Sequence, residues 1–274
     1  MFKGHIVALP TPFKENSLDL HALKNLVLHQ IEAGVDGLVI LGTTGERSAL
    51  TDHEQNLVVE TVLGLAKGKL PIIVNIGCND TQKSAAATEH AMRLGADGCL
   101  AVVPYYNKPP LRGIIAHYDA ISSVGLPVIA YHHPGRTGVR LNADAWTQIL
   151  RLPNVVALKE ASGDLELVKA LAHQADILCG DDHLTSQMMQ LGAKGTVSVI
   201  GNLIPKLWST ALYETSALQP LLDALSLDVN PIPVKCGLEI LGFTTSEVRL
   251  PLMRAEESTR RALKNALELA LCAQ

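Results

Sequence analysis

The chain has 274 residues, of which 47% are hydrophobic and 18% are charged, and its formal net charge at pH 7 is −4. A mildly acidic chain gains little from neutralising phosphates, which argues against nucleic-acid and anionic-membrane partners. The high apolar content excludes extended disorder, and no apolar run reaches the roughly 18 residues that cross a bilayer.

The amino-terminal residues 1–14 contain too short an apolar run for a secretory signal peptide and show no cleavage pattern. Five cysteines, at positions 78, 99, 179, 236 and 272, are widely spaced and form no CxxC pair. Four of them have apolar or small neighbours, so we expect a cytoplasmic protein with buried free thiols at these four positions.

Eight short apolar runs follow one another along the chain, separated by segments with helical spacing. They are residues 5–9, 37–41, 71–75, 98–103, 127–131, 154–159, 176–179 and 195–199. Runs that are apolar on both faces indicate parallel strands covered on both sides. Eight such units favour a closed (β/α)₈ TIM barrel over an open doubly wound sheet. The sequence contains neither of the phosphate-loop motifs, GxGxxG and GxxxxGK[ST], that would favour the open sheet.

Two signals place the intervening helices. Thr51 followed by Glu54 predicts a capping box at the start of a helix. A four-residue motif with glycine at both ends recurs at residues 34–37, 95–98 and 192–195. Its first glycine suits the left-handed backbone conformation that ends a helix.

We expect the barrel, as residues 1–215, to be followed by a helical extension, residues 216–274, that has no core of its own. The helical pattern is broken at Asn230–Pro233. Beyond that break, one long amphipathic stretch is predicted through Leu252, Ala255, Glu256, Thr259, Leu263, Leu267 and Leu271. The extension would pack on the barrel or on a neighbouring subunit.

In barrels of this type the active site lies at the carboxyl ends of the strands. Those positions carry Gly-Thr-Thr-Gly-Glu at 42–46, Pro-Tyr-Tyr-Asn at 104–107, Tyr-His-His-Pro-Gly-Arg-Thr-Gly at 131–138, Lys-Glu at 159–160 and Gly-Asp-Asp at 180–182.

Lys159 closes an apolar run, so its amine is expected at the barrel mouth, where burial lowers the pKa. A neutral lysine attacks carbonyls and forms a Schiff base, an electron sink for making or breaking carbon–carbon bonds. The structural alternative is a salt bridge of Lys159 with Glu160 or Asp181.

Three tyrosines, Tyr105, Tyr106 and Tyr131, fall at predicted strand ends in a chain with only 4% aromatic residues. A phenol there is able to pass a proton to or from a carbinolamine or enamine, whereas the alternative is an aromatic ring that packs a loop or an interface. Arg136 offers a fork-shaped partner for a substrate carboxylate, and its alternative is a loop salt bridge.

The Gly42–Gly45 turn between a strand and a helix suits a carboxylate or phosphate, although such turns also arise for purely geometric reasons. Adjacent His132 and His133 point to opposite faces of a strand, and neither an HExxH motif nor a cysteine cluster accompanies them. We expect no metal site.

These motifs together resemble the dihydrodipicolinate synthase family, one of the Schiff-base aldolase barrels that include N-acetylneuraminate lyase. The resemblance is carried by residues 8–12, 42–46, 104–107, 136–138, 158–163, 180–182 and 230–235. It extends over nearly the whole chain. The glycine-threonine and lysine motifs mark the superfamily, whereas Arg136 and the Asn-Pro-Ile-Pro-Val-Lys segment at 230–235 indicate the synthase.

The resemblance implies a lyase that condenses pyruvate with L-aspartate 4-semialdehyde to 4-hydroxy-tetrahydrodipicolinate in diaminopimelate and lysine biosynthesis. Its catalytic residues would be Lys159, which forms the Schiff base with pyruvate, Tyr131, which donates and accepts protons, and Thr43 and Tyr106, which complete a proton relay. Its substrate-binding residues would be Thr44 and the Val197 backbone for the pyruvate carboxylate, Arg136 for the semialdehyde carboxylate, and Gly180.

The resemblance also implies that neither a metal nor a loose cofactor is needed. The family's tyrosine at the Tyr106 position reaches across from a partner subunit. A homo-oligomer is therefore implied, with at least a dimer and usually a tetramer built as a dimer of dimers.

Two departures from the family pattern bear on substrate and regulation. His132–Gly135 stands where the family commonly has Asn-Val-Pro-Ser, which changes the wall beside the aldehyde. Asp52, Gln55 and Lys83 stand where lysine-inhibited members carry a histidine pair and a glutamate, so we expect weak or absent inhibition by L-lysine. A sub-millimolar inhibition constant would contradict this.

Two other functions remain as alternatives. Another pyruvate-dependent aldolase, acting on a keto sugar acid or a hydroxy-oxoacid, is disfavoured by Arg136, because lyases for neutral or sugar aldehydes usually lack that arginine. A non-catalytic barrel is disfavoured because a nucleophile is present together with a complete proton relay.

Overall fold

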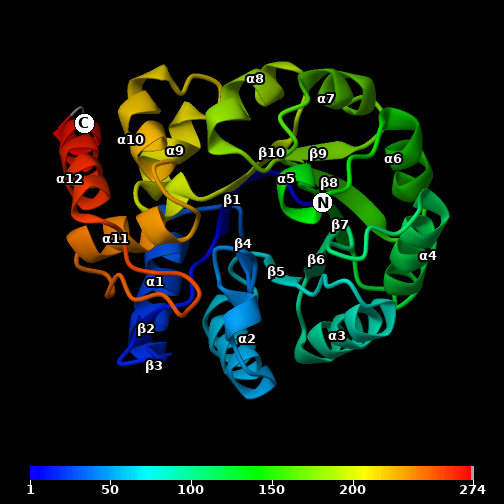
Figure 1. Cartoon of the computed structure of the whole chain (residues 1–274), viewed down its shortest axis with the longest axis horizontal. Helices are drawn as coiled ribbons and strands as arrows, with labels where there is room; N and C mark the ends of the chain where they lie inside the picture. The colour runs from blue at the N-terminus through cyan, green and yellow to red at the C-terminus, as the bar shows by residue number, and fades with distance from the viewer. Residues whose placement is uncertain (273–274) are drawn as a thin grey trace.

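Eight parallel strands close into a barrel in the computed structural model, which describes residues 1–272 (Figure 1). Around the barrel they are β1 (Gly4–Ala8), β4 (Gly37–Ile40), β5 (Ile72–Asn75), β6 (Gly98–Val102), β7 (Val128–His132), β8 (Val155–Glu160), β9 (Asp176–Cys179) and β10 (Gly195–Ser198), which pairs with β1. The predicted (β/α)₈ barrel is confirmed. Every predicted strand is present, with its ends within one residue of those expected.

Helices cover the outside of the barrel (Figure 1). They are α1 (Leu20–Ala33), α2 (Asp52–Ala66), α3 (Thr81–Leu94), α4 (Leu111–Ser122), α6 (Ala143–Leu150), α7 (Leu165–Leu171), α8 (Thr185–Gln190) and α9 (Pro205–Ala211). Short helical turns lie in the loops: η1 (Arg47–Ala49), α5 (Pro134–Thr137), η2 (Asp182–Leu184), η3 (Ile200–Asn202) and η4 (Ser216–Leu218). The predicted capping box of Thr51 and Glu54 begins α2, and Gly34 and Gly95 end α1 and α3 in the left-handed conformation.

A hairpin that the sequence pattern does not predict lies between β1 and α1. Its strands, β2 (Phe13–Lys14) and β3 (Ser17–Leu18), are joined by Glu15 and Asn16 with φ of 52° and 59°. Positive φ at both central residues is typical of a tight hairpin turn. Strands of two residues are too short to show an alternating pattern, which is why the hairpin was missed.

The interior of the barrel is filled by alternate side chains of the strands. This inner cluster contains Ile6, Val39, Ile73, Leu100, Ile129, Ala157, Leu178 and Val197, and it is separate from the larger cluster that includes the helices. Because successive strand residues face opposite sides, Tyr131 and Lys159, two residues beyond Ile129 and Ala157, point into the barrel mouth.

The carboxyl-terminal extension forms α10 (Gln219–Leu225), α11 (Ile232–Ile240) and α12 (Glu257–Cys272), which lie at one side of the barrel (Figure 1). The expected amphipathic helix is present, but its predicted start was wrong, because Leu252, Ala255 and Glu256 precede α12. They belong to an irregular segment that is held by side-chain contacts to the barrel loops. The predicted break comes at residues 230–231, since Pro233 already lies in the first turn of α11.

Apolar side chains of the extension share the main hydrophobic cluster with the barrel. Leu221, Val234, Leu263 and Leu267 are buried in the same cluster as Trp208 of α9. The division of the chain at residue 215 stays a prediction. In residues 1–272, no helix combines the length and the apolar character needed to cross a bilayer.

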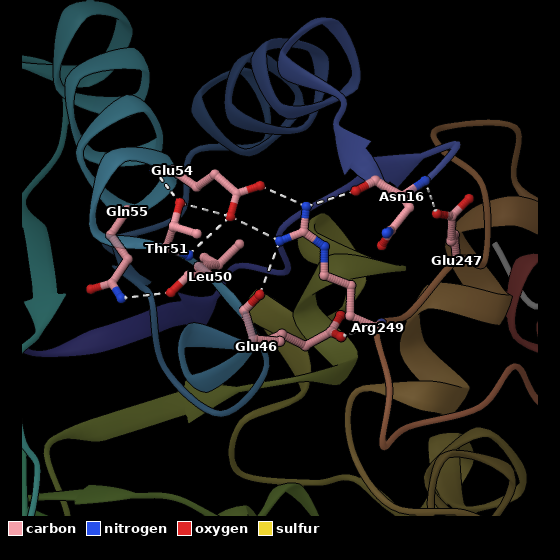
Figure 2. A network of polar contacts seen from close by, with 9 residues as sticks. Asn16, Glu46, Leu50, Thr51, Glu54, Gln55, Glu247 and Arg249 are labelled. Carbon is pink, nitrogen blue, oxygen red and sulfur yellow. Dashed lines mark hydrogen bonds and ion pairs between the residues drawn. The ribbon is translucent and has the colours of Figure 1, made fainter.

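A polar network ties the segment before α12 to the loop that follows β4 (Figure 2). The Arg249 guanidinium donates two hydrogen bonds to Glu54, at 2.9 and 2.6 Å, and others to the carbonyls of Ala49 and Asn16. The hydrogen bonds from Arg249 are the main cause that lowers the pKa of Glu54 to about 2, and its positive charge adds a smaller effect. The backbone amide of Arg249 donates to the Glu46 carboxylate at 3.0 Å.

Glu46 also receives a buried cation from α11. The Lys235 ammonium lies 2.5 Å from the Glu46 carboxylate, and both side chains are almost fully buried. Lys235 and Arg249 each lie over the ring of Phe13, at 4.1 and 4.4 Å from its centroid. The extension thus holds the loop after β4 and the β2–β3 hairpin through charged groups.

All five cysteines are free. Cys99, Cys179 and Cys236 are buried as expected, and Cys78 is half-buried. Cys272, at the end of α12, is exposed.

We predict that a chain ending at residue 215 does not fold. It would expose the face that α10–α12 cover and would leave the buried Glu46 carboxylate without Lys235, a loss that costs about 3–5 kcal/mol by itself. Urea unfolding followed by circular dichroism is expected to show no cooperative transition for this chain, with the full chain as control. A cooperative transition in the shortened chain would identify residues 1–215 as an independent domain.

Candidate active site

A cavity of about 920 Å³ opens at the carboxyl ends of the barrel strands. Six of the predicted site residues line it: Thr43, Thr44, Tyr131, Arg136, Lys159 and Gly180. They come from the loops or ends of β4, β7, β8 and β9. The extension contributes Asn230 and Arg249 to the same wall.

Lys159 lies buried at the base of this cavity, with its amine 4.4 Å from the centroid of the Tyr131 ring. Burial lowers the pKa of Lys159 to about 8, and the positive charge of Arg136 contributes to the lowering, whereas Asp182 opposes it. Within residues 1–272, Lys159 forms no salt bridge, so the expected alternatives with Glu160 and Asp181 are not realised. The lowered pKa gives Lys159 a larger neutral fraction near physiological pH than a solvent-exposed lysine has.

Tyr131 is the strand neighbour of Lys159 in the β7–β8 register. Burial raises the pKa of Tyr131 to about 12, although Arg136 lowers it. Loss of solvent disfavours the charged form of each group, which is the ammonium ion of Lys159 and the phenolate of Tyr131. It therefore lowers the pKa of the lysine and raises the pKa of the tyrosine. At neutral pH the cavity contains an amine that is easily deprotonated beside a phenol that keeps its proton.

Directly behind these residues, the outer faces of β7 and β8 are joined by a buried polar pair. His132 Nδ1 lies 2.7 Å from the Glu160 carboxylate, and His132 Nε2 accepts a hydrogen bond from the Leu141 backbone at 3.3 Å. The proton of a neutral ring is therefore on Nδ1, which donates to Glu160. Glu160 accepts a second hydrogen bond from the Ser162 amide at 2.5 Å. The pair fixes the two strands at the level of Tyr131 and Lys159.

The two histidines face opposite sides, as the sequence predicts. His133 lines the cavity, with its ring centroid 5.9 Å from that of Tyr131. Burial and the charges of Arg136 and Lys159 lower the pKa of His133, which favours its neutral imidazole. In the described residues, no three His, Cys, Asp or Glu side chains are grouped to hold a metal ion.

The loop after β4 presents Thr43 exposed and Thr44 buried toward the cavity. A Cβ at Gly45 would lie 3.0 Å from the Leu41 backbone nitrogen, so this tight turn requires glycine. The Thr44 hydroxyl accepts a hydrogen bond from the Asn230 amide at 2.9 Å. Sequence reasoning did not place Asn230 in the site. The signal was present in the 230–235 segment, which it read only as a family motif.

Arg136 and Gly180 also line the cavity. Arg136 is exposed on the short helix α5, which starts two residues after β7, and its guanidinium forms no salt bridge in the described residues. A Cβ at Gly180 would lie 2.8 Å from Lys159 Cε, so glycine at this position leaves room for the lysine.

Two predicted residues are not brought to the cavity wall of this chain. Tyr106 is 89% exposed, has φ of 71°, and is replaced in the wall by Tyr105. Val197 is buried inside the barrel, and its role through the backbone stays a prediction.

Of the residues behind the expected weak lysine inhibition, Gln55 lines the cavity. Gln55 accepts a hydrogen bond from Arg47 at 3.1 Å and donates to the Leu50 carbonyl at 3.1 Å (Figure 2 shows the latter), while Asp52 and Lys83 are exposed. The weak inhibition by L-lysine stays a prediction.

A buried lysine and a buried phenol at the carboxyl mouth of a (β/α)₈ barrel match the class of Schiff-base aldolase barrels. The sequence model of the Dihydrodipicolinate synthetase family matches residues 1–270. The chain belongs to this family.

Relatives and solved structures agree along the full length. The 4-hydroxy-tetrahydrodipicolinate synthase of Syntrophus aciditrophicus is 39% identical over 285 residues, covering 98% of each chain. The dihydrodipicolinate synthase of Thermotoga maritima superposes with a TM-score of 0.94 at 36% identity, over 98% of this chain and 99% of the other. The chloride-inhibited enzyme of Acinetobacter baumannii complexed with pyruvate has a TM-score of 0.95 at 37% identity, over 98% and 99%.

We predict that Lys159 reacts as an amine with a pKa near 8. Acetylation by a trace amount of acetic anhydride, mapped by mass spectrometry between pH 6 and 11, is expected to rise through a midpoint near pH 8, because the neutral fraction grows as the pH passes the lowered pKa. The same lysine in the urea-unfolded chain serves as control and is expected near the ordinary value of about 10.4. A midpoint of the folded chain near that value would show a solvated ammonium.

Proposed function

We propose that this chain is a synthase that condenses pyruvate with L-aspartate 4-semialdehyde to 4-hydroxy-tetrahydrodipicolinate. The observation that carries the proposal is Lys159, a buried amine that lies against Tyr131 in a cavity that also holds the Arg136 guanidinium. Neither cation has a carboxylate partner among residues 1–272. Membership of the family supports the same reaction.

In this reaction the neutral Lys159 amine attacks the ketone carbon of pyruvate. The carbinolamine loses water to give the iminium, and loss of a methyl proton then gives the enamine. The enamine carbon attacks the aldehyde carbon, forming the new carbon–carbon bond. The substrate amine finally attacks the imine carbon and displaces Lys159, which closes the ring and frees the enzyme.

Tyr131 is the proton donor and acceptor of these steps. Its raised pKa keeps the phenol protonated, so it is able to protonate the departing hydroxyl of the carbinolamine. Arg136 opposes that rise and so stabilises the phenolate while it takes up the next proton. Thr43, at the cavity wall, and Tyr106 would relay protons between Tyr131 and solvent.

The substrate carboxylates are assigned to separate groups. Thr44 and the Val197 backbone would hold that of pyruvate, with Gly180 leaving space beside Lys159, and Arg136 would hold that of the semialdehyde. No metal or loose cofactor is needed in this scheme, because Lys159 itself supplies the electron sink.

We propose that the active unit is at least a dimer and that two such dimers form a tetramer. Tyr106 supports this, because an 89% exposed ring on a backbone with φ of 71° is costly for a bulky residue unless a contact holds it. One solved relative is described as a monomeric variant, so assembly varies among similar proteins. A biosynthetic role also supports the cytoplasmic location expected from the sequence.

A second pyruvate-dependent aldolase activity is favoured by one observation. His133 places an imidazole in the wall beside Tyr131, where the family pattern has an apolar residue. A keto sugar acid or a hydroxy-oxoacid with more hydroxyl groups would find a hydrogen-bonding partner there.

We predict that borohydride reduction in the presence of pyruvate modifies Lys159. Lys235 is the internal control, because its pKa is also lowered to about 8 but Glu46 binds its ammonium and it lies outside the cavity lining. An adduct on another lysine would refute the proposed nucleophile.

Tyr131→Phe is expected to lower turnover by about 100- to 10,000-fold through the loss of general acid–base catalysis. Faster turnover with a sugar-derived aldehyde than with aspartate semialdehyde would establish the second activity.

We predict that Arg136→Lys raises the KM for aspartate semialdehyde by about ten- to a hundredfold, because a bidentate charge-assisted contact is lost. The KM for pyruvate is expected to change little. Arg140→Lys is the matched control, since Arg140 lies on the same loop but pairs with Asp164 outside the cavity. Equal effects on both substrates would remove Arg136 from recognition of the aldehyde.

A further inference from the structure

The Thr44 hydroxyl has a single partner in the described chain, and that partner comes from the extension. Thr44 is 3% exposed and lines the cavity. Its Oγ1 accepts a hydrogen bond from Asn230 Nδ2 at 2.9 Å, across 186 positions of sequence. Asn230 lines the same cavity.

This contact determines where the hydroxyl hydrogen can point. A hydroxyl has one hydrogen and two lone pairs, and Asn230 occupies one lone pair. The hydrogen must therefore lie in another direction, and residues 1–272 offer it no acceptor by hydrogen-bond geometry. The remaining direction leads into the cavity, where an anionic oxygen would accept it.

The two partners are held together by further contacts of the extension. Asn230 lies just before α11, and Lys235 in the first half of that helix binds Glu46, which is two residues after Thr44. The Arg249 backbone amide binds the other oxygen of Glu46. Figure 2 shows Glu46 and Arg249 side by side in this network. The loop and the helix are thus linked at two levels, so the Asn230 amide and the Thr44 hydroxyl keep one relative geometry.

We propose that Asn230 is a positioning residue that directs the Thr44 hydroxyl hydrogen toward the carboxylate of the α-keto acid bound at Lys159. The inference rests on the proposed function, because pyruvate is the ligand concerned. The extension then does more than cover the barrel: it sets the affinity of the first substrate by orienting a group of the barrel loop.

The proposal distinguishes an amide from a carboxylate at this position. Asn230 donates to the hydroxyl, so the hydroxyl must donate elsewhere. An aspartate of the same shape would accept the hydroxyl hydrogen and turn it away from the ligand. Asn230→Asp is therefore expected to weaken pyruvate binding more than Asn230→Ala, which leaves the hydroxyl free to rotate.

The test measures the pyruvate concentration that half-saturates borohydride trapping of Lys159, a readout that needs no second substrate. Asn230→Asp is expected to raise this concentration about tenfold, the usual size of a lost hydrogen bond to a charged group. Asn230→Ala is expected to raise it by a smaller factor, because the Thr44 hydroxyl keeps its hydrogen but is no longer held in one direction. In a Thr44→Val background the same substitution is expected to have no further effect. Thr44→Ser retains the hydroxyl and is expected to retain the sensitivity to Asn230→Ala.

A matched control separates positioning from general loosening of the fold. Asn142→Ala removes the capping contact of Asn142 with the Ala145 amide at the start of α6, outside the cavity lining, and is expected to leave the half-saturating concentration unchanged. The KM for the aldehyde is expected to stay the same in Asn230→Ala.

An equally large effect of Asn230→Ala with and without the Thr44 hydroxyl would overturn the proposal, as would normal pyruvate binding by Asn230→Asp. If the unsubstituted chain gives no pyruvate adduct on Lys159, the proposed function fails and this inference fails with it. If the adduct forms but no aldehyde condenses, only the assignment of the second substrate fails, and the Asn230 test still decides the inference.

Discussion

The chemistry of this protein depends on the burial of one amine without a counter-ion. Lys159 lies at the base of the cavity and forms no salt bridge in the described residues, so loss of solvent lowers its pKa instead of being offset by an ion pair. The same environment raises the pKa of Tyr131. Burial therefore activates the nucleophile, Lys159, and keeps the proton on the donor, Tyr131. It does so because both residues, neighbours on β7 and β8, face the interior of the barrel.

The remaining contacts keep those neighbours in place. His132 and Glu160 join β7 and β8 on their outer faces, directly behind Tyr131 and Lys159. The Glu160 carboxylate is thereby engaged away from the cavity. Because adjacent strand residues face opposite sides, a carboxylate next to the lysine in sequence does not neutralise it in space.

The extension holds the loop after β4 in place. The cations of Lys235 and Arg249 bind Glu46 and Glu54, and Asn230 binds Thr44. Such buried pairs contribute little net stability against apolar packing, but they allow a narrow range of geometries. The loop is consequently shaped by residues that lie about 190 positions later in the chain.

The sequence by itself determined the barrel, its eight strands, the lysine and tyrosine at the mouth and the family, because continuous apolar runs, capping residues and strand-end motifs are local signals. It missed the two-residue strands of the hairpin and placed the start of α12 too early, since the segment around Arg249 is held by distant carboxylates. Only the tertiary structure decided that Lys159 has no carboxylate partner in residues 1–272, that His132 binds Glu160 while His133 lines the cavity, and that Asn230 binds Thr44. These arrangements involve residues far apart in sequence, and they depend on how the barrel closes and how the extension packs on it.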